Sequence, residues 1–177
     1  YAYLNIVFED FKLKHPDLLI KKEEPGLTKT EREEFLNDFT LNNQMTSFCV
    51  LGGSFSEGID LVGKKLIGAA IVGVGMPQIS SERNIVKNYF ENLYRKGFDY
   101  AYTFPGMNKV MQAVGRVIRS EDDKGAVLLI DDRYLTNKYI SLMPYEWSNY
   151  KKIRNNEEMI SILNMFWRSV DKEKSIW

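Results

Sequence analysis

The side chains best suited to phosphate chemistry lie in one short run, QAVGRVIR at 112–119. A helix over this run places Gln112, Arg116 and Arg119 on one face, because their spacing follows the helical period. Gly115 shares this face and leaves the backbone open to a close approach. The guanidinium fork matches phosphate oxygens, and its charge stabilises the transition state of γ-phosphoryl transfer. An exposed helix face with two solvated arginines is the alternative interpretation.

A second candidate stretch directly follows an apolar run and reads GGSFSEGIDL at 52–61. Its glycines permit a tight backbone course, and successive N–H groups in such a turn face an anion. The candidate ligand-facing residues of this stretch are Ser54, Ser56, Glu57, Gly58 and Asp60. A glycine-rich strand-to-helix turn with solvated carboxylates explains the same residues without a ligand.

Other motif-like features of the sequence indicate no chemistry. Residues 58–65 nearly match the phosphate-binding pattern G-x-x-x-x-G-K-[ST], but Lys65 replaces the hydroxyl and an apolar run follows. His15, the only histidine, lies beside Pro16 away from any group of catalytic side chains. Cys49, the only cysteine, cannot by itself hold zinc or an iron–sulfur cluster. We therefore expect no metal site in this chain.

Composition and charge narrow the class of protein. The 177 residues include 24 Lys+Arg and 24 Asp+Glu, so the formal net charge of zero excludes a wholly basic nucleic-acid binder. A nucleic-acid groove stays open, since it needs only local positive charge. Hydrophobic residues make up 44% of the chain, enough for one folded domain over 1–177. The longest apolar run, 66–75, is far shorter than the roughly 20 residues of a membrane span, so we expect a soluble protein with no membrane partner. A single cysteine is typical of a reducing compartment, so we expect the protein in the cytoplasm.

Apolar periodicity predicts strands that alternate with helices. Strands are predicted at the continuous apolar runs 17–22, 47–51, 66–74 and 126–130. Runs without polar alternation are typical of strands buried on both faces of a parallel sheet. Helices are predicted over residues 4–11, 30–39, 81–96, 106–120 and 159–170.

Capping residues predict where helices begin and end, and the order of the elements predicts the edge of the sheet at which ligands bind. Thr30 and Glu33 predict a capping box at the start of the second helix, and Gly97 predicts the residue after the end of the third. The alternation of elements predicts an α/β fold with a parallel sheet and helices on both faces. Ligands bind such sheets beyond the carboxyl ends of the strands, which are the loops at 52–58 and 131–133.

Three segments taken together resemble superfamily 2 helicases of the XPD/DinG branch. GGSFSEGIDL at 52–61 resembles motif V of that branch, QAVGRVIR at 112–119 resembles motif VI, and GAVLLIDDRY follows at 125–134. Further similar stretches are IVGVGMP at 71–77, FDYAYTFPGMNKV at 98–110 and MPYEW at 143–147. The resemblance covers nearly the whole chain. It implies the second, RecA-like motor domain of a longer helicase, with the first strand of that domain upstream of Tyr1.

The resemblance also implies roles for individual residues. Arg119 would be the arginine finger, Arg116 a second γ-phosphate contact, and Gln112 a polar group that positions them. The residues implied to face the nucleotide are Glu57, Gly58, Asp60 and Gly115. Ser54 and Ser56 would donate to DNA phosphates. Stacking of bases on Tyr100, Tyr102 or Phe104 is a weaker implication, and core packing is the favoured interpretation of these aromatic side chains.

The expected partners follow from the ATP- and Mg²⁺-binding residues that this chain does not contain. The resemblance implies that the first motor domain of the same parent chain carries the lysine and carboxylates that bind ATP and Mg²⁺, so this chain is expected to be inactive alone. The parent is expected to step 5′→3′ along single-stranded DNA and to act in DNA repair. Whether the parent holds an iron–sulfur cluster is open.

Two interpretations from other classes stay open at this point. One is a doubly wound domain that binds a small phosphorylated metabolite at the same strand ends. The other is a non-catalytic interaction module in which Arg116 and Arg119 form structural ion pairs with Asp131 or Asp132.

Overall fold

The computed structural model describes residues 1–39, 44–53, 55, 66–118 and 123–174. It divides into two compact units, Tyr1–Tyr134 and Leu135–Trp177. The prediction of a single domain over 1–177 stays a prediction. Among the helices in these ranges, none combines the length and apolarity that crossing a bilayer requires.

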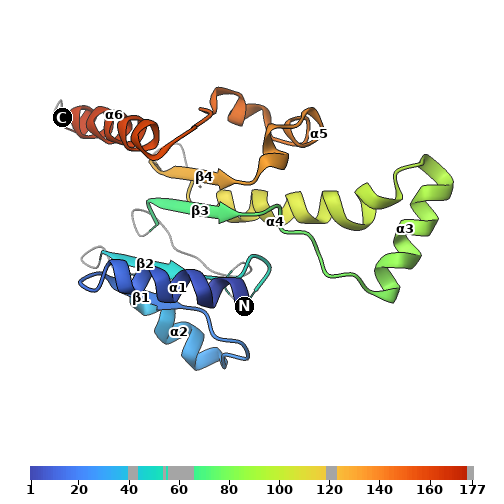
Figure 1. Cartoon of the computed structure of the whole chain (residues 1–177), viewed down its shortest axis with the longest axis horizontal. Helices are drawn as coiled ribbons and strands as arrows, with labels where there is room; N and C mark the ends of the chain where they lie inside the picture. Colours follow the sequence, from blue (N-terminus) through green and yellow to red (C-terminus); the bar gives the residue numbers. More distant parts are fainter. Residues whose placement is uncertain (40–43, 54, 56–65, 119–122, 175–177) are drawn as a thin grey trace. The chain divides into compact units, whose positions relative to one another are not determined.

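Two pairs of parallel strands form the centre of the first unit (Figure 1). β1 (Leu19–Lys22) pairs with β2 (Met45–Phe48), with Leu19 opposite Met45. β3 (Gly68–Val72) pairs with β4 (Ala126–Ile130), with Gly68 opposite Ala126. The predicted strands and their parallel direction are confirmed. β1 and β3 are shorter than their apolar runs, and β2 covers 45–48 where the sequence predicts 47–51.

The strands are less buried than their apolar sequences predict. Ile71 is 6% exposed, whereas Val72 is 50% exposed and Ile130 is 45% exposed. The physical reason is the size of the sheets, because a pair of strands leaves an outer edge on each strand within the described residues. The expectation of strands buried on both faces is therefore wrong for β3 and β4.

Aromatic side chains attach the first helix to the first strand pair. α1 (Ala2–Lys14) runs along β1 and β2 (Figure 1), and the rings of Phe8 and Phe11 meet Phe48 of β2 edge to face at 5.5 and 5.3 Å. Such aromatic pairs contribute roughly 0.5–1.5 kcal/mol beyond the area they bury. The predicted apolar face of this helix is confirmed.

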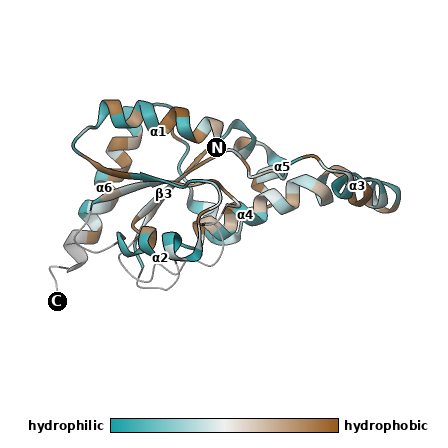
Figure 2. Ribbon diagram, turned by 90° about the horizontal axis from the view of Figure 1, so that it is seen from below, coloured by the Kyte–Doolittle hydropathy of each residue, from teal (hydrophilic) through white to brown (hydrophobic). Residues whose placement is uncertain are grey.

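The second helix starts two residues earlier than the sequence signal predicts. α2 (Lys29–Asn37) is capped by Thr28, whose Oγ1 accepts a hydrogen bond from the Glu31 N–H, while Glu31 Oε2 accepts from the Thr28 N–H at 2.7 Å. The capping box is thus Thr28 with Glu31, and the prediction of Thr30 with Glu33 is wrong. Both pairs have the same spacing, so sequence alone does not separate them. Figure 2 shows α2 largely in hydrophilic colours, and its buried Phe35 stacks on Phe55.

The third helix ends through a left-handed residue that is not glycine. α3 (Ser81–Tyr94) is followed by Arg95 with φ of 55°. Gly97 was expected at this left-handed position, and that prediction is wrong. The buried Gly97 instead donates its N–H to Glu91 Oε2 at 2.9 Å, and a Cβ there would collide with the Lys87 carbonyl oxygen. Close packing against α3, and not backbone conformation, explains this glycine.

A π-helical turn connects α3 to the helix that carries the first candidate stretch. This turn, η1 (Asp99–Thr103), leads directly into α4 (Phe104–Val114), and the Phe104 N–H donates to the Asp99 carbonyl. Pro105 has no N–H for the Ala101 carbonyl, and Arg83 Nη1 of α3 donates to that oxygen at 3.1 Å. Figure 1 shows α3 turning back through η1 into α4.

Aromatic packing fills the junction between these helices. Tyr100 stacks on Phe90 with ring centroids 4.0 Å apart and contacts Phe104 edge to face at 5.1 Å. Tyr102 is 6% exposed. Packing is therefore what these three predicted aromatic candidates do in the described structure.

The second unit is helical in the described part of the chain. η2 (Asp132–Leu135) bridges the boundary between the units. The unit continues with α5 (Asn137–Ile140), η3 (Tyr145–Asn149) and α6 (Asn156–Lys174). The predicted last helix is confirmed, and Val170 of its apolar face is 5% exposed.

Candidate functional site

α4 is fixed in the first unit by its most buried residues. Met107 is 1% exposed and Val110 is fully buried. Gly106 allows the helix backbone to approach the end of β3, because a Cβ on Gly106 would lie 2.5 Å from the Val74 carbonyl oxygen. A larger residue at Gly106 would push α4 away from the loop after β3. The helix is thus held at its first turns while its later turns carry the candidate side chains.

The candidate stretch at 112–118 is only partly helical. Gln112 lies exposed on the last turn of α4, which ends at Val114. Arg116 and Val117 then form a tight turn in which their N–H groups donate to the Ala113 and Val114 carbonyls at 3.2 and 2.9 Å. The predicted helix over 106–120 is therefore too long, and the predicted single helical face holds only for the residues up to Val114.

Gly115 is the residue at which α4 ends. Glycine costs about 1 kcal/mol relative to alanine inside a helix, and Gly115 stands at the C-cap with φ of −63° and ψ of −7°. A Cβ on Gly115 would meet only the carbonyl oxygens of Met111 and Gln112 within 4 Å. The surface beside Gly115 is therefore open to a close approach within the described residues.

The glycine turn after β2 lies against α4. Gly52 has φ of 86°, and a Cβ on it would come within 2.7 Å of Lys109 Nζ. Leu51 meets the loop after β3, since a Cβ on Gly75 would lie 2.8 Å from Leu51 Cδ2. Gly52, at the start of the 52–61 stretch, therefore lies against α4, the helix whose last turn carries Gln112.

Lys109 is a residue of this site that the sequence analysis missed. It precedes Gln112 by three residues and Arg116 by seven, a spacing that extends the same polar series toward the start of the helix. That spacing is the signal by which it could have been found. Lys109 thus places one positive charge beside the glycine turn.

Glu23 is a second missed residue. It directly follows β1, its side chain is fully buried, and its Oε2 accepts a hydrogen bond from the Val50 N–H at 2.8 Å. In the sequence it stands in the charged run KKEE at 21–24, which predicts a solvated surface. Burial of one glutamate in such a run has no signal at the sequence level.

The loop after β4 is organised by a local ion pair. Arg133 Nε and Nη2 donate to the two carboxylate oxygens of Asp131 at 2.8 and 2.7 Å. The hydrogen bonds from Arg133 hold the pKa of Asp131 below its ordinary value. Tyr134, 4% exposed, donates its hydroxyl to the Gly73 carbonyl at 2.7 Å and so ties this loop to the end of β3. Asp131 therefore has a described partner in its own loop.

Several candidate residues lie outside the described ranges. They are Ser54, Ser56, Glu57, Gly58, Asp60 and Arg119. Their roles stay predictions.

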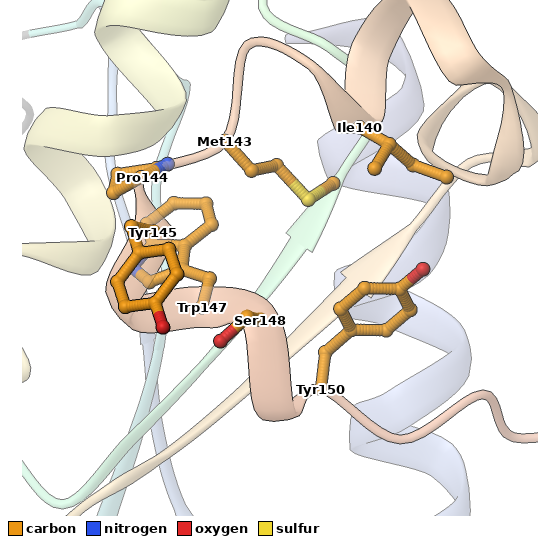
Figure 3. A pocket seen from close by; sticks show the side chains of 7 residues that line it. All are labelled: Ile140, Met143, Pro144, Tyr145, Trp147, Ser148 and Tyr150. Atoms are coloured by element: carbon orange, nitrogen blue, oxygen red, sulfur yellow. The ribbon is translucent and has the colours of Figure 1, made fainter.

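The described residues show no cluster of three or more side chains that could hold a metal ion. The second unit has a small hollow of about 170 Å³ lined mainly by apolar and aromatic side chains, among them Met143, Tyr145 and Trp147 (Figure 3). Ligand pockets for small molecules are commonly 300–1,000 Å³. This hollow is smaller than that range and carries no charged lining residue.

Comparison with known families defines the class of protein. The model of the family described as "Helicase C-terminal domain" matches residues 1–150, which is most of the chain. The chain therefore belongs to the helicase C-terminal domain family. The resemblance to the XPD/DinG branch of superfamily 2 helicases is confirmed.

Individual relatives agree with this family. The chain is 26% identical over 176 residues to the "3'-5' exonuclease DinG" of Staphylococcus epidermidis, which covers 95% of the chain and 19% of that protein. It is 29% identical over 135 residues to a "Regulator of telomere elongation helicase 1 homolog" of Drosophila yakuba, covering 72% of the chain and 14% of that protein. The chain thus spans about a fifth or less of the length of these curated relatives.

A solved structure confirms the fold. The chain superposes on a structure titled "XPD_Helicase" with a TM-score of 0.62 and 21% identity, over 84% of this chain and 27% of that one. At this identity the likeness shows the fold alone. The predicted RecA-like α/β fold with parallel strands is confirmed.

Proposed function

We propose that this chain is the second motor domain of an ATP-dependent DNA helicase that moves 5′→3′ on single-stranded DNA. The observation that carries the proposal is the contact between Lys109 of α4 and the turn at Gly52, because it brings the start of the 52–61 stretch against the helix whose last turn carries Gln112. The first motor domain of the same parent chain is the proposed partner across the ATP cleft. Location in the cytoplasm and a part in DNA repair stay predictions from the sequence.

The hydrogen-bond donors of α4 and of the turn that follows it fit a polyphosphate. Lys109, Gln112 and Arg116 offer N–H groups, and neither a lysine nor an arginine side chain can accept a hydrogen bond. Bound ATP supplies the γ-phosphoryl group that is transferred to water. The proposal assigns the binding of ATP and Mg²⁺ mainly to the first motor domain.

Each candidate residue then has a role in the proposal. Arg119 is the arginine finger, Arg116 is a second contact to the γ-phosphate, and Gln112 positions the two guanidiniums. An arginine finger raises the rate of comparable phosphoryl transfers by about 10³–10⁵-fold, since its fixed charge meets the charge that develops on the transferred group. Glu57, Gly58, Asp60 and Gly115 form the edge that faces the nucleotide.

DNA contacts are proposed for the same loop. Ser54 and Ser56 donate their hydroxyls to DNA phosphates, which would couple the nucleotide edge to the strand. Phosphate contacts of this kind position a strand without reading its sequence.

Family membership favours the motor domain over a metabolite-binding domain. The family match covers residues 1–150 and includes both candidate stretches.

The test is the single-stranded-DNA-stimulated ATPase of the full-length parent protein. Arg119→Ala is expected to lower kcat by about 10³-fold or more with nucleotide affinity largely kept, and Arg116→Ala and Gln112→Ala to lower it by smaller factors. Arg154→Ala is the matched control, because Arg154 is exposed in the second unit. Unchanged ATPase in folded Arg119→Ala, or no DNA-stimulated ATPase in the wild type, would contradict the proposal.

A further inference from the structure

We propose that Glu23 is a positioning residue, which holds the turn at 50–53 so that the loop beginning there meets α4 in the geometry that ATP hydrolysis needs. The inference deepens the function proposed above and rests on it. Glu23 belongs to neither candidate stretch.

The position of Glu23 follows from the strand that precedes it. β1 ends at Lys22, and the Glu23 N–H continues the parallel pairing by donating to the Phe48 carbonyl at 2.8 Å. This bond fixes the backbone of Glu23 beside the end of β2. The side chain therefore emerges where the chain leaves β2 and enters the glycine turn.

The carboxyl group of Glu23 is built into that turn. Its Oε2 accepts from the Val50 N–H at 2.8 Å, and its Oε1 accepts from the Tyr1 hydroxyl at 3.4 Å. Glu23 is fully buried, although glutamate is almost never fully buried without a partner. A buried carboxyl group costs free energy unless it is hydrogen-bonded, so a fully buried one beside a turn fixes the turn or destabilises the fold.

The turn packs closely against the carboxyl group of Glu23 at Gly53. A Cβ on Gly53 would lie 2.6 Å from Glu23 Oε1 and 2.8 Å from Oε2, both shorter than any ordinary contact. The Gly53 N–H also donates to the Val50 carbonyl at 2.8 Å, which closes the turn around the same point. The absence of a side chain at Gly53 is what permits the carboxyl group to reach the Val50 N–H.

The turn is held from two sides. Glu23 holds it from the end of β1, and Lys109 lies against Gly52 from α4. The turn lies between the end of β2 and α4, the helix that carries Gln112. A displacement of the strand end therefore also displaces the contact with the helix. A misplacement of about 1 Å at such a site costs on the order of 10²-fold in rate.

The first measurement is amide hydrogen exchange of the full-length parent protein, read on peptides that cover residues 47–55. Glu23→Ala is expected to speed exchange of the Val50 amide by about tenfold or more, because the N–H loses its acceptor. Peptides of α3 are expected to keep their exchange rates. Glu24→Ala is the matched control, since its neighbouring side chain is 55% exposed and paired with Lys22. Equal exchange in the two variants overturns the proposal.

The second measurement is kcat and KM of the DNA-stimulated ATPase. Glu23→Ala is expected to lower kcat by about 10-fold to 100-fold, with KM for ATP changed by less than about threefold. Glu23→Gln keeps an oxygen for the Val50 N–H and is expected to recover most of that kcat. A folded Glu23→Ala with wild-type kcat, or a Glu23→Gln no better than Glu23→Ala, overturns the proposal.

A second variant, at Gly53, tests the proposal if Glu23→Ala does not fold. Gly53→Ala leaves Glu23 in place but pushes a methyl group against its carboxyl oxygens. It is expected to give the same loss of kcat and the same faster exchange at Val50, and wild-type values of both overturn the proposal. A parent protein without DNA-stimulated ATPase contradicts the helicase function, whereas the exchange measurement still decides the role of Glu23 in the turn.

Discussion

Lys109 of α4 lies against the backbone of Gly52, the left-handed residue of the turn that follows β2. A Cβ on Gly52 would meet Lys109 Nζ at 2.7 Å and its Cε at 3.1 Å. The positive φ favours glycine at this position, and the end of the Lys109 side chain would have to move to make room for a Cβ. The glycine turn after β2 and α4 are in close contact at this point.

Gly52→Ala is expected to destabilise the protein and to displace Lys109. The left-handed conformation costs a residue with a Cβ about 1–2 kcal/mol. Gly26→Ala is a matched control, because Gly26 has φ of 79° and nothing within 4 Å of its Cβ position. Urea unfolding should show similar losses in the two variants, since the end of the lysine side chain can move. The DNA-stimulated ATPase of the parent should fall only in Gly52→Ala, and an equal fall in both would show that the lysine contact has no role.

Thr28→Ala is expected to lower the free energy of unfolding by about 1 kcal/mol, the usual cost of losing an N-cap side chain. Thr30→Ala is the internal control, because Thr30 lies within α2 and the observed capping box uses Thr28 and Glu31. Thermal or urea unfolding of the two variants checks the result. A larger loss in Thr30→Ala would restore the capping box predicted from the sequence.

Arg133→Gln is expected to raise the pKa of Asp131 toward its ordinary value of 3.8, because hydrogen bonds from Arg133 are the main cause of its lowered pKa. A lowered folded-state pKa means that the stabilisation is present above pH 3.8 and is lost as the pH falls through the lowered pKa. The Arg133 side chain is 46% exposed, so the contribution to stability stays below about 1 kcal/mol.

Carbon-13 NMR titration of the Asp131 carboxyl group is therefore the appropriate measurement. Asp132→Asn serves as the control, since the two oxygens that accept from Arg133 Nε and Nη2 belong to Asp131. An unchanged Asp131 titration in Arg133→Gln would show that another group sets its pKa.

The strands were predictable because their signal is local. The run AVLLI gives the bounds of β4 without error, and the order of strands and helices gives the parallel pairing. The exposure of Val72 and Ile130 was not predictable in this way, because it depends on how many strands lie beside each pair.

The candidate site was predictable only in part. Gln112 and Arg116 stand out by residue type, and the glycines at 52–53 mark a turn. The end of α4 at Val114 was missed, because Gly115 lowers helix propensity only by about 1 kcal/mol and tertiary packing decides whether the helix continues. Glu23 was missed for a different reason: a charged residue in a charged run is ordinarily solvated, and only the folded chain brings the Val50 N–H to it.

The π-helical turn at Asp99–Thr103 sets the rotational phase of everything that follows it in α4. A π turn holds one more residue than an α turn, and each residue of a helix advances it by about 100°. Were the turn regular, Gly106 would no longer face the Val74 carbonyl, and Lys109 would point away from Gly52. The extra residue of the π turn therefore rotates α4 about its own axis and determines which side of the helix faces the strand ends.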